Sequence, residues 1–320
     1  MLGLALVSRK SLQLLALLLS LSAMIGCGSG NKTAPEGGAA APQASSFTVV
    51  CTTGMVADFV REIGGEQLQV VQLMGEGVDP HIYKASPADL RALGRASAIV
   101  YSGLHLEGKL AQVLERMGDS KPVLAVAETL PKDSLLATGG DSFDPHCWMD
   151  VRLWQQTVTP IEEFLSKQLP EHKEKFSERS AKLQKRLQSL DESIRQQLAE
   201  IPAERRVLVT AHDAFRYFGK SYDVEVRGLQ GVSTESEAGV KTVNDLVQFL
   251  VERKIKAVFV ETSISEQNMH ALQEGCRSLK HELKIGGELY SDALGKLGTP
   301  EGTYEGMIQH NIQTIVTAIK

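Results

Sequence analysis

The chain has 320 residues, of which 42% are hydrophobic and 23% are charged, and its formal net charge is −5. This composition is typical of a globular protein. It shows no excess of basic residues of the kind that binds nucleic acid, so we expect no nucleic-acid partner. The length suggests about two domains.

Residues 1–26 are predicted to be a signal peptide. Arg9 and Lys10 precede the apolar run SLQLLALLLSLSAMIGC, which has the length of a signal-peptide core and is too short to span a membrane. The run ends in MIGC, which is similar to the cleavage box of bacterial lipoproteins, although Met24 stands where Leu is usual. We expect Cys27 to carry the lipid. The alternative is an ordinary signal peptide with an incidental cysteine.

Residues 27–46 are predicted to form a flexible tether. The stretch GSGNKTAPEGGAAAPQASS is rich in Gly, Ala, Pro and Ser and nearly free of large apolar residues, so it cannot bury a core. A lipid followed by a tether would place the folded part outside the cytoplasmic membrane, in the periplasm or on the cell surface, with the lipid holding it to a membrane.

Three further cysteines follow, at Cys51, Cys147 and Cys276. An odd number in an exported protein leaves at least one unpaired. One disulfide between two of them and three free thiols both remain compatible with the sequence.

Residues 47–169 are predicted to form an N-terminal α/β lobe. Helical patterns at 55–65 and 86–96 alternate with β-rich runs at 47–53, 68–75, 97–103 and 121–128. The second helix has Ser86 as its N-cap and Pro87 in its first turn. Strands that alternate with helices favour parallel pairing and right-handed crossovers.

Residues 170–201 are predicted to form one long amphipathic helix. After Pro170 the segment has no Gly or Pro, and its apolar positions are mostly three or four residues apart, at Phe176, Leu183, Leu187, Leu190, Ile194 and Leu198. A helix of about 29 residues would be roughly 43 Å long, which exceeds the width of a small domain. We therefore expect a rigid helix that links two lobes; a surface helix or a coiled-coil segment is the alternative.

Residues 202–320 are predicted to form a C-terminal α/β lobe, because the alternation resumes with β-rich runs at 205–213, 224–229, 256–262 and 281–290. The expected fold class is α/β, with two lobes that are each a mostly parallel sheet flanked by helices, joined by one long rigid helix.

The tripeptide Asp-Pro-His occurs twice, in VDPHIY and FDPHCW, within a chain of only eight histidines. Each proline keeps the preceding Asp out of helical space, so His81 and His146 follow in extended turns with a defined direction. Asp79 and Asp144 can accept a hydrogen bond from a ring nitrogen or a nearby amide. A structural turn would explain one copy, whereas two copies with an aromatic residue two positions later suggest a shared role.

Two residues of the C-terminal lobe are their counterparts. His212 ends a buried strand pattern in RVLVTAHD, and Asp292 follows another in IGGELYSDALG. Ligands bind at the carboxyl ends of strands in open α/β sheets. Three imidazoles and one carboxylate suit Zn²⁺, Mn²⁺ or Fe²⁺.

The other histidines carry less signal. His105 follows a strand and could contact the ligands indirectly. His172, His270 and His281 lie in charged helical or turn contexts and are predicted to be solvated, and His310 is predicted to lie on the last helix, at the surface or in the core.

The chain resembles the TroA-like (cluster A-I) zinc and manganese receptors among the solute-binding proteins of ABC transporters. The resemblance covers about Phe47 to Lys320, in motifs that include TTGMVADFVREI, LMGEGVDPHIY, YSGLHLEGKL, FDPHCWMDV, AERRVLVTAHDAFRYFG, GLQGVSTESEA and GGELYSDALG. It implies two α/β lobes joined by a long helix, with metal ligands at His81, His146, His212 and Asp292. It also implies delivery of the captured cation to a membrane permease.

The metal remains open between manganese, zinc and iron. Many zinc-selective members of that family have a His- and acid-rich loop between the first two ligands, whereas residues 104–145 hold only His105, which favours manganese or mixed use. Manganese-dedicated members often have Glu as the third ligand, whereas His212 provides nitrogen, which favours zinc.

The expected function is that of a monomeric, non-enzymatic metal receptor, and the sequence leaves two rival functions. A zinc hydrolase could use Glu261 as its general base, but the chain lacks HExxH, and Glu261 is more simply an ion-pair or hydrogen-bond partner within its lobe. A surface adhesin or a receptor for haem or a siderophore would share the architecture. An organic ligand needs a wide cleft lined with aromatics or arginines, and aromatics are 5% of the chain. A rigid linking helix further predicts a small metal-induced change near Asp292.

Overall fold

The computed structural model describes residues 47–320. The signal peptide, Cys27 and the tether predicted for residues 1–46 lie outside the described residues. Below, residues 47–169 are called the N-terminal half and residues 202–320 the C-terminal half; the lobe boundaries at these positions stay a prediction.

The N-terminal half is built on a parallel sheet of four strands in the order β2-β1-β3-β4. The strands are β1 (Thr48–Cys51), β2 (Gln69–Gln72), β3 (Ala98–Tyr101) and β4 (Val123–Ala125). The connecting helices are α1 (Gly54–Gly64), α2 (Pro87–Arg95) and α3 (Ala111–Met117). As predicted, Ser86 caps α2, in a reciprocal pair with Asp89.

Alternate residues of the central strands enter two different cores, because successive side chains of a strand point to opposite faces. Val49 and Cys51 of β1 join the large core that also contains α1, whereas Val50 joins a smaller core. In that smaller core Val50 packs among residues of α2 and α3, such as Leu93 and Leu114. Both faces of the sheet are thus covered, which explains the continuous apolar runs in these strands.

A short antiparallel pair that the sequence did not predict leads into the second Asp-Pro-His. It consists of β5 (Ala137–Gly139) and β6 (Ser142–Phe143). Gly139 and Gly140 have φ of 127° and 57°, a region that favours glycine, and they make the tight turn between the two strands. The helices α4 (Val151–Gln155) and α5 (Val158–Gln168) follow.

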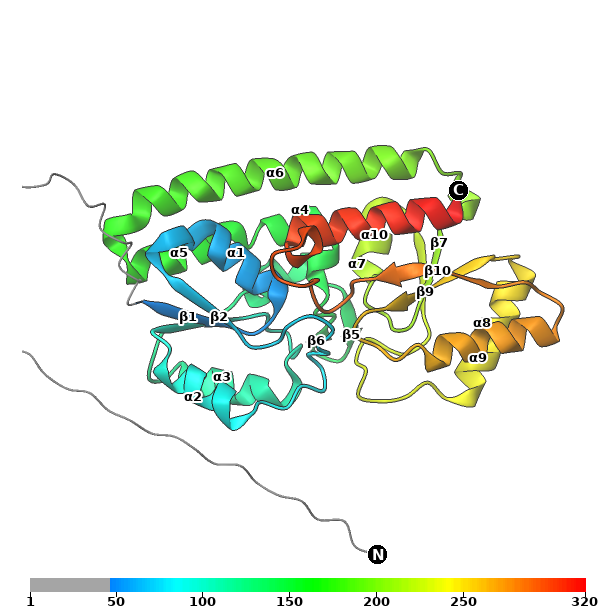
Figure 1. Ribbon diagram of the computed structural model, residues 1–320, viewed down its shortest axis with the longest axis horizontal. Coiled ribbons are helices and arrows are strands. Elements are labelled where there is room, and N and C mark those ends of the chain that lie inside the picture. Colours follow the sequence, from blue (N-terminus) through cyan, green and yellow to red (C-terminus); the bar gives the residue numbers. More distant parts are fainter. Residues whose placement is uncertain (1–46) are drawn as a thin grey trace, which may run out of the picture. The chain divides into compact units, whose positions relative to one another are not determined.

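The long helix is α6 (Lys173–Ala199), which Figure 1 shows running alongside α10. All six apolar positions predicted to form its stripe are buried in the large core, and the polar residues Ser180 and Asp191 are buried on the same helix. The large core contains residues of both halves of the chain, from Val49 of β1 to Ile319 of α10. The α6 stripe therefore packs against both halves.

The C-terminal half contains two parallel strand pairs instead of one continuous sheet. The pairs are β7 (Val207–Thr210) with β8 (Glu225–Gly228) and β9 (Ala257–Glu261) with β10 (Lys284–Leu289). The helices are α7 (Arg216–Tyr222), α8 (Val240–Glu252), α9 (Gln267–Ser278) and α10 (Tyr304–Ile319). β7 and β9 share one apolar core through Val207, Val209, Val258 and Val260, and the alternate residues Leu208 and Phe259 join the large core.

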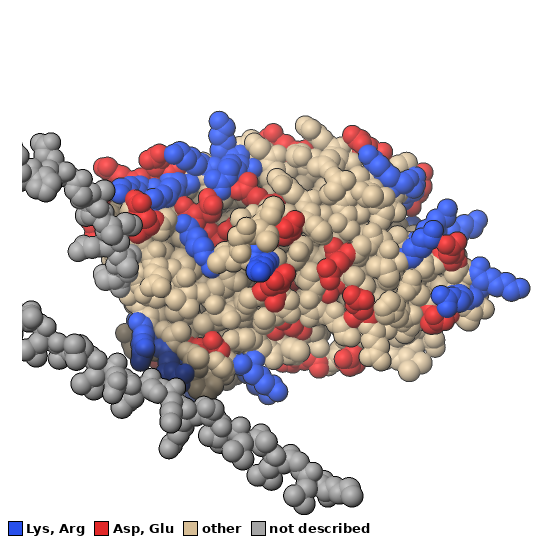
Figure 2. All heavy atoms as spheres, viewed as in Figure 1, with Lys and Arg blue, Asp and Glu red and all other residues tan. Residues whose placement is uncertain are grey.

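The surface mixes charges of both signs. In Figure 2 acidic side chains gather over the middle of the visible face, and most basic side chains lie toward its two ends. Among residues 47–320 no helix is both long and apolar enough to cross a membrane. The three cysteines Cys51, Cys147 and Cys276 are all free and buried.

Candidate metal centre

Each Asp-Pro-His forms the same local turn, which explains why the tripeptide recurs. The backbone N–H of His81 donates to Oδ1 of Asp79 over 2.9 Å, and the backbone N–H of His146 donates to Oδ1 of Asp144 over 3.0 Å. An Asp side chain that accepts from the backbone two residues later fixes a turn. The two imidazoles therefore project from the N-terminal half in directions that these turns fix.

The other two side chains follow strands of the C-terminal half. His212 lies two residues after β7, and Asp292 lies three residues after β10. The backbone N–H of His212 donates to Oε1 of Glu261, the last residue of β9, over 2.8 Å. The carboxyl ends of three strands thus meet at this site, as expected for an open α/β fold.

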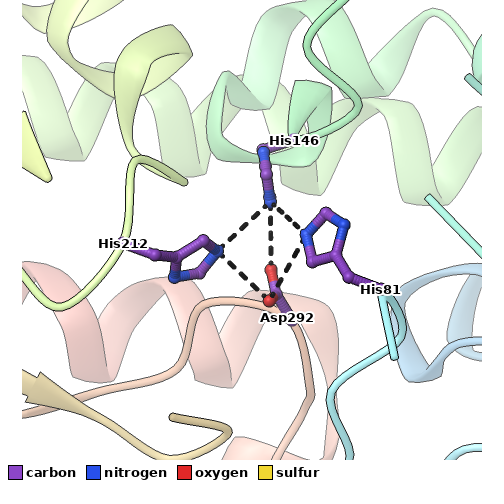
Figure 3. Close-up of side chains that lie close together, drawn as sticks. All are labelled: His81, His146, His212 and Asp292. Atoms are coloured by element: carbon purple, nitrogen blue, oxygen red, sulfur yellow. Dashed lines mark hydrogen bonds and ion pairs between the residues drawn. The ribbon is translucent and has the colours of Figure 1, made fainter. Parts of the chain in front are cut away.

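The four predicted ligand side chains, His81, His146, His212 and Asp292, converge on one point (Figure 3). One potential donor atom from each lies within 4.8 Å of all the others, and all four residues are buried. Nε2 of His146 is 3.2 Å from Nε2 of His81 and 3.4 Å from Nε2 of His212. The carboxylate oxygens of Asp292 lie 3.3 Å from Nε2 of His146 and 3.2 Å from Nε2 of His212.

Hydrogen bonds alone cannot satisfy this arrangement. Nε2 of His146 carries at most one proton, yet it faces two other ring nitrogens and a carboxylate. Both carboxylate oxygens of Asp292 are buried, and within the described chain neither has a hydrogen-bond partner of acceptable geometry. Buried polar atoms are normally paired, and an unpaired one calls for an ion or another partner. A shared cation would satisfy all four side chains at once.

The spacing also matches a metal site. Around a tetrahedral ion with bonds of about 2.0–2.1 Å, neighbouring donor atoms lie about 3.3 Å apart. Four of the six pairs are 3.2 to 3.4 Å apart, Nε2 of His81 is 3.9 Å from Asp292, and the pair of His81 and His212 lies within the 4.8 Å that bounds the whole group. The residues therefore fit a divalent transition-metal ion with little rearrangement.

Carboxylates orient two of the three imidazoles. Nδ1 of His146 is 2.7 Å from Oδ1 of Asp144, and Nδ1 of His212 is 2.6 Å from Oε2 of Glu261. Oδ2 of Asp144 accepts in turn from Arg216 over 3.3 Å. A carboxylate on Nδ1 fixes the ring and directs Nε2 to a metal, and it raises the basicity of that nitrogen.

The pKa values follow from burial and these neighbours. Burial opposes the charged form of His146, but the charge of Asp144 and a hydrogen bond to it raise the pKa of His146 to about 9. Burial likewise opposes the charge on His212, but Glu261 and Asp292 raise its pKa well above the ordinary value. His81 has no carboxylate on its ring, and burial lowers its pKa to about 4, although Asp292 opposes the shift. Burial disfavours ionised Asp292, but the charges of His212 and His146 bring its pKa well below the usual range.

The remaining predicted residues lie near the centre in different ways. Asp79, Asp144 and Glu261 contact the predicted ligands, and both oxygens of Glu261 accept hydrogen bonds from His212. His105 lines a hollow beside His81, and no hydrogen bond joins its ring to the four side chains within the described part of the chain.

Two contacts at the centre were missed from the sequence. The indole N–H of Trp148 donates to the backbone oxygen of Ser291 over 2.9 Å and so links the segments that carry His146 and Asp292. The hydroxyl of Thr234 donates to Oδ2 of Asp79 over 2.6 Å. The motifs FDPHCWMDV and GLQGVSTESEA contain these residues, but a motif does not reveal a contact over 143 or 155 positions.

Known proteins are similar to this chain in sequence and in fold. The manganese-binding lipoprotein MntA of Bacillus subtilis (strain 168) is 47% identical over 306 residues, which cover 95% of this chain and 98% of MntA. The zinc-binding protein TroA of Treponema pallidum (strain Nichols) is 47% identical over 271 residues, which cover 85% of this chain and 88% of TroA.

The solved structure of the periplasmic zinc-binding protein TroA from Treponema pallidum superposes with a TM-score of 0.84 at 47% identity and covers 85% of this chain and 98% of that chain. The resemblance to TroA-like receptors and the predicted fold class are confirmed. The family described as "ZnuA: Zinc-uptake complex component A periplasmic" matches residues 49–318, and the chain belongs to this family.

Proposed function

We propose that the protein is an extracytoplasmic receptor that binds one divalent transition-metal ion through His81, His146, His212 and Asp292 and delivers it to the permease of an ABC transporter. The observation that carries this proposal is the convergence of four buried donor atoms at metal-like spacing, with both oxygens of Asp292 unpartnered. Two ligands come from each half of the chain, so the ion would join the halves.

Manganese and zinc both remain candidates as cargo, with Fe²⁺ as a third. Three nitrogens and one carboxylate bind all three ions, and the general affinity order favours zinc at equilibrium. The names of the two relatives do not decide, because MntA is named for manganese and TroA for zinc at the same 47% identity.

The wider setting belongs to the same proposal. Cys27 would carry a lipid that holds a monomeric receptor at a membrane, with residues 27–46 as the tether. The protein would have no catalytic activity, since both oxygens of Glu261, the base that a hydrolase would need, are engaged by His212. Mass spectrometry of the processed N-terminus tests the lipid, and light scattering tests the monomer.

Metal titration of ligand variants tests the site. Binding to the native state alone stabilises a protein by about 2.7 kcal/mol at a hundredfold excess over Kd. Wild type should gain this stability with Mn²⁺ or Zn²⁺ in thermal unfolding, and His81→Ala, His212→Ala and Asp292→Ala should lose most of it. His270→Ala, which removes an exposed imidazole on α9, is the matched control. If the three ligand variants bind like wild type, the assignment is wrong.

A further inference from the structure

His81 differs from the other two histidines in how it is held. His146 and His212 each have a carboxylate on Nδ1, whereas no hydrogen bond reaches Nδ1 of His81 from any residue that the structure describes. His81 is also the most exposed of the four residues, at 6% against 0–2% for the others. Its position is therefore set mainly by its backbone, through the bond to Asp79.

A hollow of about 540 Å³ lies beside His81. Its walls come from segments 104–112, 138–145 and 232–235, and His81 is the one member of the four that contributes to them, as far as the described chain shows. Both Glu235 and Lys109 line it, beside apolar residues such as Phe143 and Val232. The hollow therefore reaches the four side chains through His81.

The third wall belongs to residues 229–239, here called the strap, which join β8 to α8 without helix or strand. The beginning of the strap is fixed beside His212. The backbone N–H groups of Leu229 and Gln230 donate to the backbone oxygens of Thr210 and Ala211, and the oxygen of Gly231 accepts from the N–H of Asp213. Its middle crosses to the other half of the chain, where Thr234 donates to Asp79 over 2.6 Å.

Asp79 thus connects the strap to His81. One carboxylate oxygen accepts from the backbone of His81, and the other accepts from Thr234, 155 positions away. A hydrogen bond to an ionised acceptor is stronger than one between neutral groups. The bond is nevertheless one hydrogen bond at the edge of a partly exposed segment, so it can open without unfolding the core.

We propose that the hydrogen bond from Thr234 to Asp79 is a latch that holds the strap against the His81 turn, and that its opening lets the cation enter and leave through the hollow. This inference rests on the proposed function, because it assumes that the four side chains bind the cation. Thr234 and Asp79 are positioning residues here, since they act through His81 and the strap.

A latch and a simple support for His81 differ in their kinetics. If exchange requires an open form, the fraction of open protein multiplies both the association and the release rate constants. Weakening the latch then raises both rate constants and changes Kd little. If the bond only orients His81 for coordination, its loss speeds release, leaves association unchanged and weakens Kd.

Stopped-flow exchange of Zn²⁺ in the full chain separates the two. Release is followed by mixing zinc-loaded protein with an excess of a chromophoric chelator. Entry is followed by tryptophan fluorescence, since the ring of Trp148 is 5.2 Å from that of His146. Thr234→Val keeps the shape of the side chain and removes the donor. Both rate constants should rise about tenfold, the size expected for loss of one hydrogen bond to a charged group.

Two further variants complete the experiment. Thr234→Ser keeps the hydroxyl and should behave like wild type. Thr317→Val makes the same substitution as Thr234→Val at an exposed position of α10, away from the hollow, and should also leave both rate constants unchanged.

Three results would overturn the latch while leaving the metal site intact: wild-type kinetics in Thr234→Val, faster release with unchanged association, or a Thr234→Ser variant as fast as Thr234→Val. Failure of wild type itself to take up Zn²⁺ would instead remove the proposed function, and the latch with it.

Discussion

The carboxylates behind His146 and His212 determine how the site handles protons as well as how it is oriented. A charged Asp144 or Glu261 holds a proton on its imidazole in the metal-free protein, and ionised Asp292 adds to this effect. A metal ion binds the neutral imidazole, so it must displace these protons. The same carboxylates then favour the metal by raising the basicity of Nε2. Cation and proton thus compete for the same nitrogens.

Metal binding should therefore release protons and strengthen as the pH rises. The pKa of His146 is raised to about 9 and that of His212 well above its ordinary value, so both imidazoles favour the protonated form in the metal-free protein near neutral pH. Each proton released makes the affinity rise by about tenfold per pH unit. Calorimetry of Zn²⁺ or Mn²⁺ binding in buffers of different ionisation enthalpy measures the number of protons.

Glu261→Gln tests the cause of this proton release. The variant removes the charge that raises the pKa of His212, so fewer protons should be released, and the affinity should fall by about 10- to 100-fold. Glu288→Gln, an exposed change on β10, should change neither quantity. Equal proton release by wild type and Glu261→Gln would contradict this account of the centre.

At the scale of elements, a buried carboxylate joins the first and last helices of the described chain. Asp58 of α1 accepts from the backbone N–H of Tyr304, the first residue of α10, over 2.9 Å. An acceptor at a helix N-terminus satisfies a free N–H and interacts well with the helix dipole. Burial nevertheless outweighs this bond and raises the pKa of Asp58 to about 6.

Because the folded-state pKa of Asp58 is raised, the folded protein becomes less stable as the pH rises. The ordinary value for Asp58 is 3.8, so between about pH 4 and pH 6 the folded protein holds a proton that the unfolded chain has lost. The free energy of unfolding should fall across this window by about 3 kcal/mol from this residue. Asp58→Asn should remove that decrease, as measured by urea unfolding of the metal-free protein at several pH values. Asp133→Asn, at an exposed position, should keep it.

Local sequence patterns predicted the helices and strands well where a regular spacing of apolar residues distinguishes one type of element from the other. The stripe of α6 from Phe176 to Leu198 was visible in the sequence, since a helix repeats every 3.6 residues and its buried face must be apolar. The pair β5–β6 was missed because its short strands are mostly exposed and lack the apolar pattern of a strand. Its signal was the Gly139-Gly140 turn alone.

The residues of the candidate site also fall into two groups, those that local sequence patterns indicate and those that only the folded structure reveals. The four predicted ligands were identified because rigid turns and strand ends mark them locally, and the same turns indicated Asp79 and Asp144. The bonds of Thr234 and Trp148 join segments that only the packed structure brings together, so no local pattern could predict them. Whether the four side chains bind a metal stays a prediction for the titration of their variants.

At the scale of the whole described chain, α6 is fixed to both halves. Arg179, near its beginning, donates to the backbone oxygen of Gly64 at the end of α1 over 2.8 Å. Farther along, Asp191 accepts from the hydroxyl of Tyr222 over 3.0 Å, and Arg195 donates to the backbone oxygen of Ser221 over 2.7 Å. The apolar stripe between these contacts lies in a core that both halves share. A hinge motion of one half against the other would have to open this core.

Metal loading should therefore leave the overall dimensions nearly unchanged. Close-packed cores resist deformation, and a helix without Gly or Pro in its interior does not bend easily. Small-angle scattering of metal-free and loaded protein should give the same radius of gyration within error. Hydrogen exchange should slow mainly in the strap, which bonds to residues beside His81 and His212, and in the segment that carries Asp292, since neither is part of a helix or strand. Asp292→Ala, treated with the same metal, serves as the control. A clear decrease in the radius of gyration of wild type alone would show that α6 bends, and the strap would then be one part of a larger closure instead of the moving element.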